Sequence, residues 1–176
     1  FVENMGEIKS MGYFCMTNIA LTPYEKKVEP QISDKRAVLG AFSRIAAITS
    51  PEQVIWQYGP IIMTEHTDYK AHIRTFQYLA ERINGTASTV VFSGLQDVLD
   101  IGVRREIGYR ETRDTDLAMM VREMAHIARE NRIQPALYAN QQQLARLTAL
   151  EVTPLVSGAQ IAKLRGAVSH GYKNDA

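Results

Sequence analysis

Five short apolar segments recur along the chain, and residues typical of turns bound each of them. None shows strict alternation of apolar and polar positions, and this continuous pattern is typical of strands that are covered on both faces. The segment 54–63 is the clearest, because it opens with the β-forming run Val-Ile-Trp and turns polar at Gln57. The pattern predicts strands at residues 13–21, 54–63, 88–95, 134–139 and 152–156.

Segments with helical periodicity lie between the predicted strands. Apolar stripes with a spacing of three or four residues predict helices around residues 38–46, 69–83, 117–128 and 144–150, a shorter one at 161–164, and a candidate helix at 2–11 before the first strand. We expect Ser33 to cap the first stripe. We expect Thr67 or Asp68 to begin the second and Gly85 to end it.

The alternation of strand and helix predicts an α/β fold with a parallel sheet and right-handed crossovers. An eight-unit barrel takes about 250 residues, so the 176 residues of this chain are too few to close one. We therefore expect parallel strand–helix repeats in a partial TIM-barrel-like arrangement or an open parallel sheet. Residues 1–176 are expected to form a single domain, as a fragment of a longer barrel protein. The charged stretch 96–113 is the longest irregular segment.

Composition narrows the function classes. The chain has 20 Lys and Arg against 19 Asp and Glu, so bulk charge gives no case for nucleic acid or for an acidic membrane surface. No apolar run approaches the roughly 20 residues of a membrane helix. The single cysteine excludes an intrachain disulfide and an all-cysteine metal site within one copy. We expect a cytoplasmic protein without membrane contact.

Polar side chains gather at the ends of the predicted strands. Carboxyl ends of parallel strands share one edge of a sheet, where ligands bind in α/β proteins. Neutral donors and acceptors with one carboxylate suit a small polar ligand; the alternative is that they satisfy loop backbone groups. Asp97 is the carboxylate, and we expect it to act as a catalytic base or a cation contact. The expected ligand-binding residues are Gln57, Tyr58, Ser93, Gln96, Tyr138 and Asn140.

Other reactive residue types give weaker signals, and we predict no metal site. His66 and His72 lack the i, i+4 spacing of a helical metal pair, so we expect solvated residues at a helix start; a metal held with Glu65 and Asp68 is the alternative. Cys15 lies within a predicted strand, and we expect a buried, unreactive thiol rather than a cluster ligand or nucleophile. No glycine-rich phosphate loop follows any strand, which argues against nucleotide binding.

Several segments together resemble DUF1848, a bacterial family known as a domain of unknown function. They are the run Tyr13-Phe14-Cys15-Met16-Thr17, the pair Glu29-Pro30, the segment 54–65, the run Val90-Val91-Phe92-Ser93 and the helical segment 124–130. The resemblance implies a barrel enzyme whose C-terminal tail carries a cysteine cluster similar to the iron–sulfur motif of radical-SAM proteins. It therefore implies an iron–sulfur cluster and S-adenosylmethionine in a longer parent protein, and no cofactor within this chain.

The chain departs from the pattern of that family at its polar positions. Where the family typically reads Arg-Tyr-Asp-Pro, this chain has Gln57-Tyr58-Gly59-Pro60, and where the family has a cysteine after the fourth strand, it has Tyr138. Where the family commonly reads Cys-Ile-Asp, this chain has Leu155-Val156-Ser157. The chain also stops before the position of the cysteine cluster. Asp97 matches the family's polar position after the third strand.

Three hypotheses follow. The first is a segment or subunit of a radical-SAM-like barrel enzyme with a ligand site at the strand ends. The second is a catalytically stripped relative that acts as a structural or interaction subunit of an assembly. The third is metal-dependent hydrolysis through His66, His72 and nearby acids. Because five parallel strands leave two unpaired edges, we expect a homo-oligomer or a partner polypeptide that completes the sheet, with an interface at 13–21 or 152–156.

Overall fold

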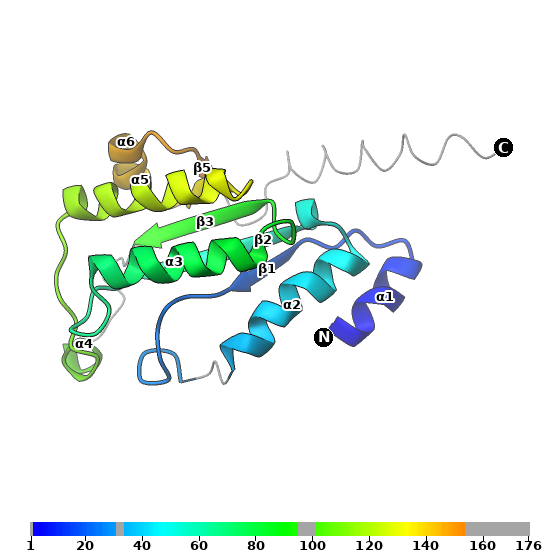
Figure 1. Ribbon diagram of the computed structural model, residues 1–176, viewed down its shortest axis with the longest axis horizontal. Helices are drawn as coiled ribbons and strands as arrows, with labels where there is room; N and C mark the ends of the chain where they lie inside the picture. The colour runs from blue at the N-terminus through cyan, green and yellow to red at the C-terminus, as the bar shows by residue number, and fades with distance from the viewer. Residues whose placement is uncertain (1, 31–33, 95–100, 154–176) are drawn as a thin grey trace.

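The computed structural model describes residues 2–30, 34–94 and 101–153 (Figure 1). These residues form an α/β fold around a five-stranded sheet in which every neighbouring pair is parallel and the strand order follows the chain. The sheet is open and does not close into a barrel. The predicted fold class is therefore confirmed. The strands are β1 (Thr17–Ala20), β2 (Val54–Ile61), β3 (Thr89–Gly94), β4 (Gln134–Tyr138) and β5 (Val152–Thr153).

Helices connect the strands and pack in a layer over one face of the sheet. Helix α2 contacts α3, α3 contacts α5, and α5 contacts α6, so the helices follow one another across the layer as the strands do across the sheet (Figure 1). Sequential strand order with one-sided crossovers is also the arrangement of the units of a (β/α) barrel. The helices are α1 (Val2–Ser10), α2 (Lys35–Ile48), α3 (Tyr69–Ile83), α4 (Ile101–Glu106), α5 (Asp114–Glu130) and α6 (Gln142–Thr148), with a 3₁₀ turn at Pro51–Gln53.

The hydrophobic core lies between the sheet and this helix layer. Trp56 of β2 stacks on Phe76 of α3 with ring centroids 4.6 Å apart, and both side chains are fully buried. The indole N–H of Trp56 donates to the carbonyl oxygen of Leu21 at 2.8 Å, so its one polar atom is satisfied. Phe92 of β3 and Met124 of α5 belong to the same cluster. This face of the sheet is the helix-covered face.

The other side of the sheet, which we call the second face, has a different composition. Alternate residues of a strand point to opposite sides, and paired residues of neighbouring strands share a side. The buried side chains of Ile55, Val91 and Ala136 on this side do not belong to the core that the helices form. Residues assigned to the second face by register are Asn18, Ala20, Ile55, Gln57, Thr89, Val91, Ser93, Gln134, Ala136, Tyr138 and Thr153.

Two expectations about the first strand are corrected. Strand β1 begins at Thr17 rather than at residue 13, and Tyr13 is 66% exposed. Cys15 therefore precedes the strand, and it is half-buried rather than fully enclosed. Cys15 packs against the core, and residues 13–16 do not join the sheet.

The predicted helix limits agree closely with the structure where it describes them. Asp68 caps α3 by accepting a hydrogen bond from Ala71 N at 2.8 Å. Asp34 caps α2, whereas the expected cap Ser33 lies outside the described residues, as do residues 154–156 and the predicted helix at 161–164. The stretch 96–113, expected to be irregular, contains the short helix α4. None of the described helices is long and apolar enough to cross a membrane.

Candidate functional site

Three of the polar residues expected at the strand ends share the second face. Gln57 pairs with Val91, and Val91 pairs with Ala136 in the parallel register. Ser93 and Tyr138 each lie two residues beyond a member of this row, so their side chains return to the side of Gln57. All three polar side chains are half-buried. The C-terminal end of the second face therefore presents an amide, a hydroxyl and a phenol, which we call the rim set.

Tyr58 does not lie with the rim set. Its side chain is on the helix-covered face and fully buried, and its hydroxyl lies 2.9 Å from Nδ1 of His72. Burial raises the pKa of Tyr58 well above its ordinary value of 10, so the phenol stays protonated at any physiological pH. Tyr58 is therefore placed in the core, as a donor to His72.

Asn140 follows β4 and is exposed, as a residue in contact with solvent or ligand would be. Its side-chain oxygen accepts a hydrogen bond from Nε2 of Gln141 at 3.1 Å. Gln141 is only 7% exposed, and its Oε1 accepts from the backbone N–H of Gly94 at 3.1 Å. Gln141 thus links the ends of β3 and β4 at the rim. Sequence reasoning missed it, because nothing distinguishes it from the glutamines that follow except its place directly before α6.

The remaining two predicted residues, Gln96 and Asp97, lie outside the described residues. The described chain stops at Gly94, at the rim, and resumes at Ile101. The proposed catalytic or cation-binding role of Asp97 and the ligand contact of Gln96 therefore stay predictions.

A close backbone contact brings β2 and β3 together at the rim. A Cβ atom built on Gly59 would lie 2.2 Å from Oγ of Ser93, 2.8 Å from its carbonyl oxygen and 3.0 Å from its nitrogen. Only a residue without a side chain fits at position 59, because two of these three neighbours are backbone atoms. The absence of a side chain at Gly59 therefore leaves the space that the Ser93 hydroxyl occupies.

Three buried aromatic side chains, Tyr24, Tyr58 and His72, hold the segment that follows β2; we call them the aromatic brace. The Tyr24 hydroxyl donates to the carbonyl oxygen of Pro60 at 2.8 Å and accepts from the backbone N–H of Ile62 at 2.6 Å. The Nε2 atom of His72 lies 3.1 Å from the carbonyl oxygen of Ile62. A carbonyl only accepts, so Nε2 carries the hydrogen and Nδ1 accepts from Tyr58. The brace fixes the path of the chain from β2 into α3.

The two histidines near the start of α3 are not a metal pair. His72 was expected to be solvated, but it is fully buried with both ring nitrogens engaged. Burial is the main cause that lowers the pKa of His72 below 6.5, so the ring is neutral. His66 is exposed and separate from it. Because His72 has no free nitrogen, hydrolysis by a metal held between the two histidines is not supported, and the described residues contain no group of three or more potential metal ligands.

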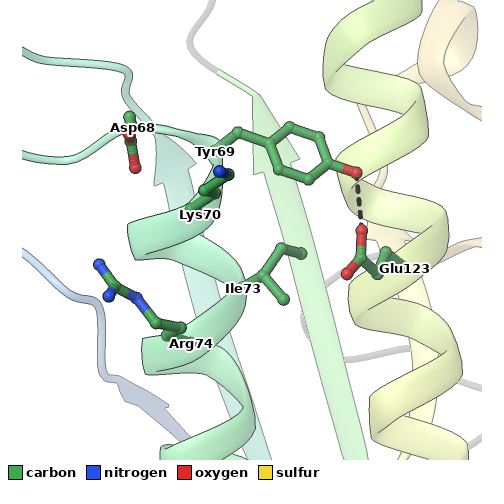
Figure 2. A pocket seen from close by; sticks show the side chains of 6 residues that line it. All are labelled: Asp68, Tyr69, Lys70, Ile73, Arg74 and Glu123. Carbon is green, nitrogen blue, oxygen red and sulfur yellow. Dashed lines mark hydrogen bonds between the residues drawn. The ribbon is translucent and has the colours of Figure 1, made fainter.

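A cavity of about 300 Å³ lies on the helix layer, between the start of α3 and α5 (Figure 2). The Tyr69 side chain reaches across to α5, where its hydroxyl donates to Oε2 of Glu123 at 2.8 Å. Burial and this hydrogen bond raise the pKa of Tyr69 to about 12. Ile73 lies below the pair in this view, and Arg74 projects from α3 on the side away from Glu123. This cavity is lined by helix residues, so it is separate from the rim set.

Comparison with known proteins places this chain in a family. Residues 1–171 match the family described as Domain of unknown function (DUF1848). The match covers almost the whole chain, so the protein belongs to this family. No similar protein was found among curated proteins, and none among solved structures.

Proposed function

We propose that this chain is part of a barrel-type enzyme that binds a small polar ligand at the C-terminal ends of β2, β3 and β4. The observation that carries this proposal is the register, which directs Gln57, Ser93 and Tyr138 to the second face at one end of the sheet. In (β/α) barrels the face turned away from the helices is the interior, and the active site lies at the C-terminal ends of the strands. The rim set occupies the corresponding place.

The rim set suits recognition of a neutral polar group. The Gln57 amide both donates and accepts, and the hydroxyls of Ser93 and Tyr138 can each do either. An amide, an aliphatic hydroxyl and a phenol are neutral hydrogen-bonding groups. We propose that the Asp97 carboxylate contacts any positively charged part of the ligand or takes part in a proton transfer.

The proposal extends to radical-SAM-like chemistry only through the family resemblance. An iron–sulfur cluster is held by several cysteine thiolates, whereas this chain has one cysteine. Cys15 precedes β1 and so lies at the N-terminal end of the sheet, opposite the rim. The residues of this chain do not fit the cluster, and we assign it no step. Cluster chemistry requires cysteines from outside residues 1–176.

A second candidate function is that of a structural or interaction subunit. In the family pattern given under the sequence analysis, arginine stands at the position of Gln57 and aspartate at that of Gly59. A cysteine stands at the position of Tyr138. Replacement of these groups by neutral ones removes the residue types that usually perform proton transfer or ligate metals. A relative of this kind would keep the fold and ligand contacts without catalysis.

Iron and sulfide analysis distinguishes these two functions. The full-length gene product is purified anaerobically, and its iron and acid-labile sulfide are measured against protein concentration. Several iron and sulfide atoms per chain support the enzyme. A full-length product free of both, in the presence of added iron and sulfide, contradicts radical-SAM chemistry and supports the subunit.

A further inference from the structure

A second cavity, of about 140 Å³, lies on the helix side of the sheet, and we call it the flank pocket. Its walls come from residues 23–28 after β1, residues 64–67 after β2, the first two turns of α3 and Ile107. None of the rim-set residues lines it. The pocket is therefore distinct from the site proposed above, and its occupancy does not depend on that proposal.

The first wall of the flank pocket is held in place from both sides. The hydroxyl of Tyr24 bonds to the backbone N–H of Ile62, which ties the loop to the end of β2. The Thr22 hydroxyl donates to Oε2 of Glu29 at 2.6 Å, and the same oxygen accepts from Nζ of Lys35 at 3.0 Å. These contacts join the two ends of the loop 22–29 to each other and to Lys35, the first residue of α2.

The second wall is also fixed by specific hydrogen bonds. Thr64 is 3% exposed, and its Oγ1 accepts from the backbone N–H groups of His66 at 3.2 Å and Thr67 at 3.0 Å. Thr64 additionally forms an isolated β-bridge with Tyr109. Hydrogen bonds within the chain thus hold both loops around the cavity. A preformed site saves the ordering cost that a flexible loop would impose on binding.

The lining of the flank pocket combines both signs of charge with apolar surface. Glu25 and Lys27, which are both exposed, belong to this lining and bring a carboxylate and an ammonium group to it. His66 and the Thr75 hydroxyl add further hydrogen-bonding groups, and Ile107 adds an apolar wall. A ligand that carries a carboxylate and an ammonium group on a short carbon skeleton would meet a complementary partner for each part.

The size of the flank pocket limits the ligand further. Its volume of about 140 Å³ is below the roughly 300–1,000 Å³ of sites for drug-sized ligands. It is close to the roughly 150 Å³ of an engineered cavity that binds benzene, a molecule of six heavy atoms. We propose that the flank pocket binds a small zwitterionic α-amino acid, of the size of alanine or serine.

Titration of the ¹⁵N-labelled full chain with L-alanine, followed by two-dimensional NMR, tests this proposal. L-Alanine should shift the amide signals of residues 25–28 and 64–67. Propionate and ethylammonium, which each carry one of the two charges, should bind about tenfold more weakly or worse, as expected when a charge-assisted hydrogen bond is lost. Glu25→Gln and Lys27→Gln should each weaken alanine binding by a similar factor.

Two controls make the outcome specific. Lys26→Gln changes an exposed neighbour that does not line the pocket, and it should leave the affinity unchanged. Gln57→Ala should also leave it unchanged, so failure of the rim proposal does not affect this test. The proposal is overturned if alanine shifts no signals, if the shifts lie away from the pocket, or if propionate binds as tightly as alanine.

Discussion

The hydroxyl of Tyr58 lies 2.9 Å from Nδ1 of His72, and both side chains are fully buried. One residue belongs to β2 and the other to α3, so this hydrogen bond joins the sheet to the helix layer inside the core. The opposite ring nitrogen of His72 is bonded to Ile62 just beyond β2. The aromatic brace therefore holds the segment that follows β2. This segment connects the rim residue Gln57 to residues 64–67, which line the flank pocket.

Removal of the Tyr58 hydroxyl should destabilise the fold. Tyr58→Phe keeps the ring but leaves the buried Nδ1 of His72 without a donor, which costs about 1–3 kcal/mol. The free energy of unfolding, measured in urea, should fall by that amount. Tyr78→Phe is the control, because Tyr78 is 50% exposed and its loss should stay within about 0.5 kcal/mol. Equal stability of the two variants would show that the buried bond contributes nothing.

Stability should depend on pH through His72. Burial lowers the pKa of His72 in the folded state below the value of 6.5 that applies to the unfolded chain. Above pH 6.5 the ring is neutral in both states, so its contribution is complete. As the pH falls below 6.5, the unfolded chain takes up the proton first, and stability is lost until the folded pKa is reached.

The measurement is the melting temperature between pH 8 and pH 5. We expect a decrease below about pH 6.5 in the wild type. His72→Gln should be less stable throughout but should lose part of this pH dependence. The exposed His126 pairs with Glu130 on the surface of α5, and His126→Gln should keep the wild-type profile. The same decrease in all three proteins would rule out His72 as the source.

A side chain at position 59 should disrupt the contact between β2 and β3. Gly59→Ala would place Cβ 2.8 Å from the Ser93 carbonyl oxygen, so the strands must separate. We expect a loss of about 1–3 kcal/mol or more, the usual cost of overpacking. Gly40→Ala in α2 has no atom within 4 Å of the new methyl group and should stabilise the protein by roughly 0.5–1 kcal/mol. A Gly59→Ala variant as stable as the wild type would contradict the packing.

The edge of β1 should promote association. The N–H of Leu21 bonds to Gln57 of β2, so in the alternating pattern of a parallel strand the N–H of Ala20 points to the open edge. We expect light scattering to show a dimer or larger species at micromolar concentration, because an unpaired edge is a template for pairing. Ala20→Pro removes the outward N–H and should reduce association, whereas Ala20→Thr should not. A monomeric wild type would contradict this prediction.

Much of the fold could be predicted from periodicity, because β2, β3 and α5 carry long apolar patterns. The direction of Tyr58 could not, since β2 is apolar on both faces and offers no alternation to follow. The burial of His72 had a signal that was missed: it lies three residues after Tyr69 and four before Phe76, within the stripe of α3 that faces the core. Helix α4 has too few apolar residues to stand out from the charged stretch around it.

The rim set was partly predictable for a simple geometric reason. Parallel strands end at one edge, so polar residues at their ends converge there whatever the loops do. Gln141 and Gly59 could not be found this way. Their roles depend on contacts between β3 and its neighbours, and those contacts follow from the register rather than from any local pattern.

A comparison of two glutamines on the second face tests the proposed ligand site most directly. Gln57 lies in the rim set, whereas Gln134 lies at the N-terminal end of the same face. A mixture of small polar metabolites serves as the probe, and ligand-observed NMR detects binding to the native chain. We expect that a compound bound by the native chain still binds to Gln134→Ala and no longer binds to Gln57→Ala, with both variants folded. Retention of that compound by Gln57→Ala, or its loss from Gln134→Ala alone, would contradict a ligand site at the C-terminal ends of the strands.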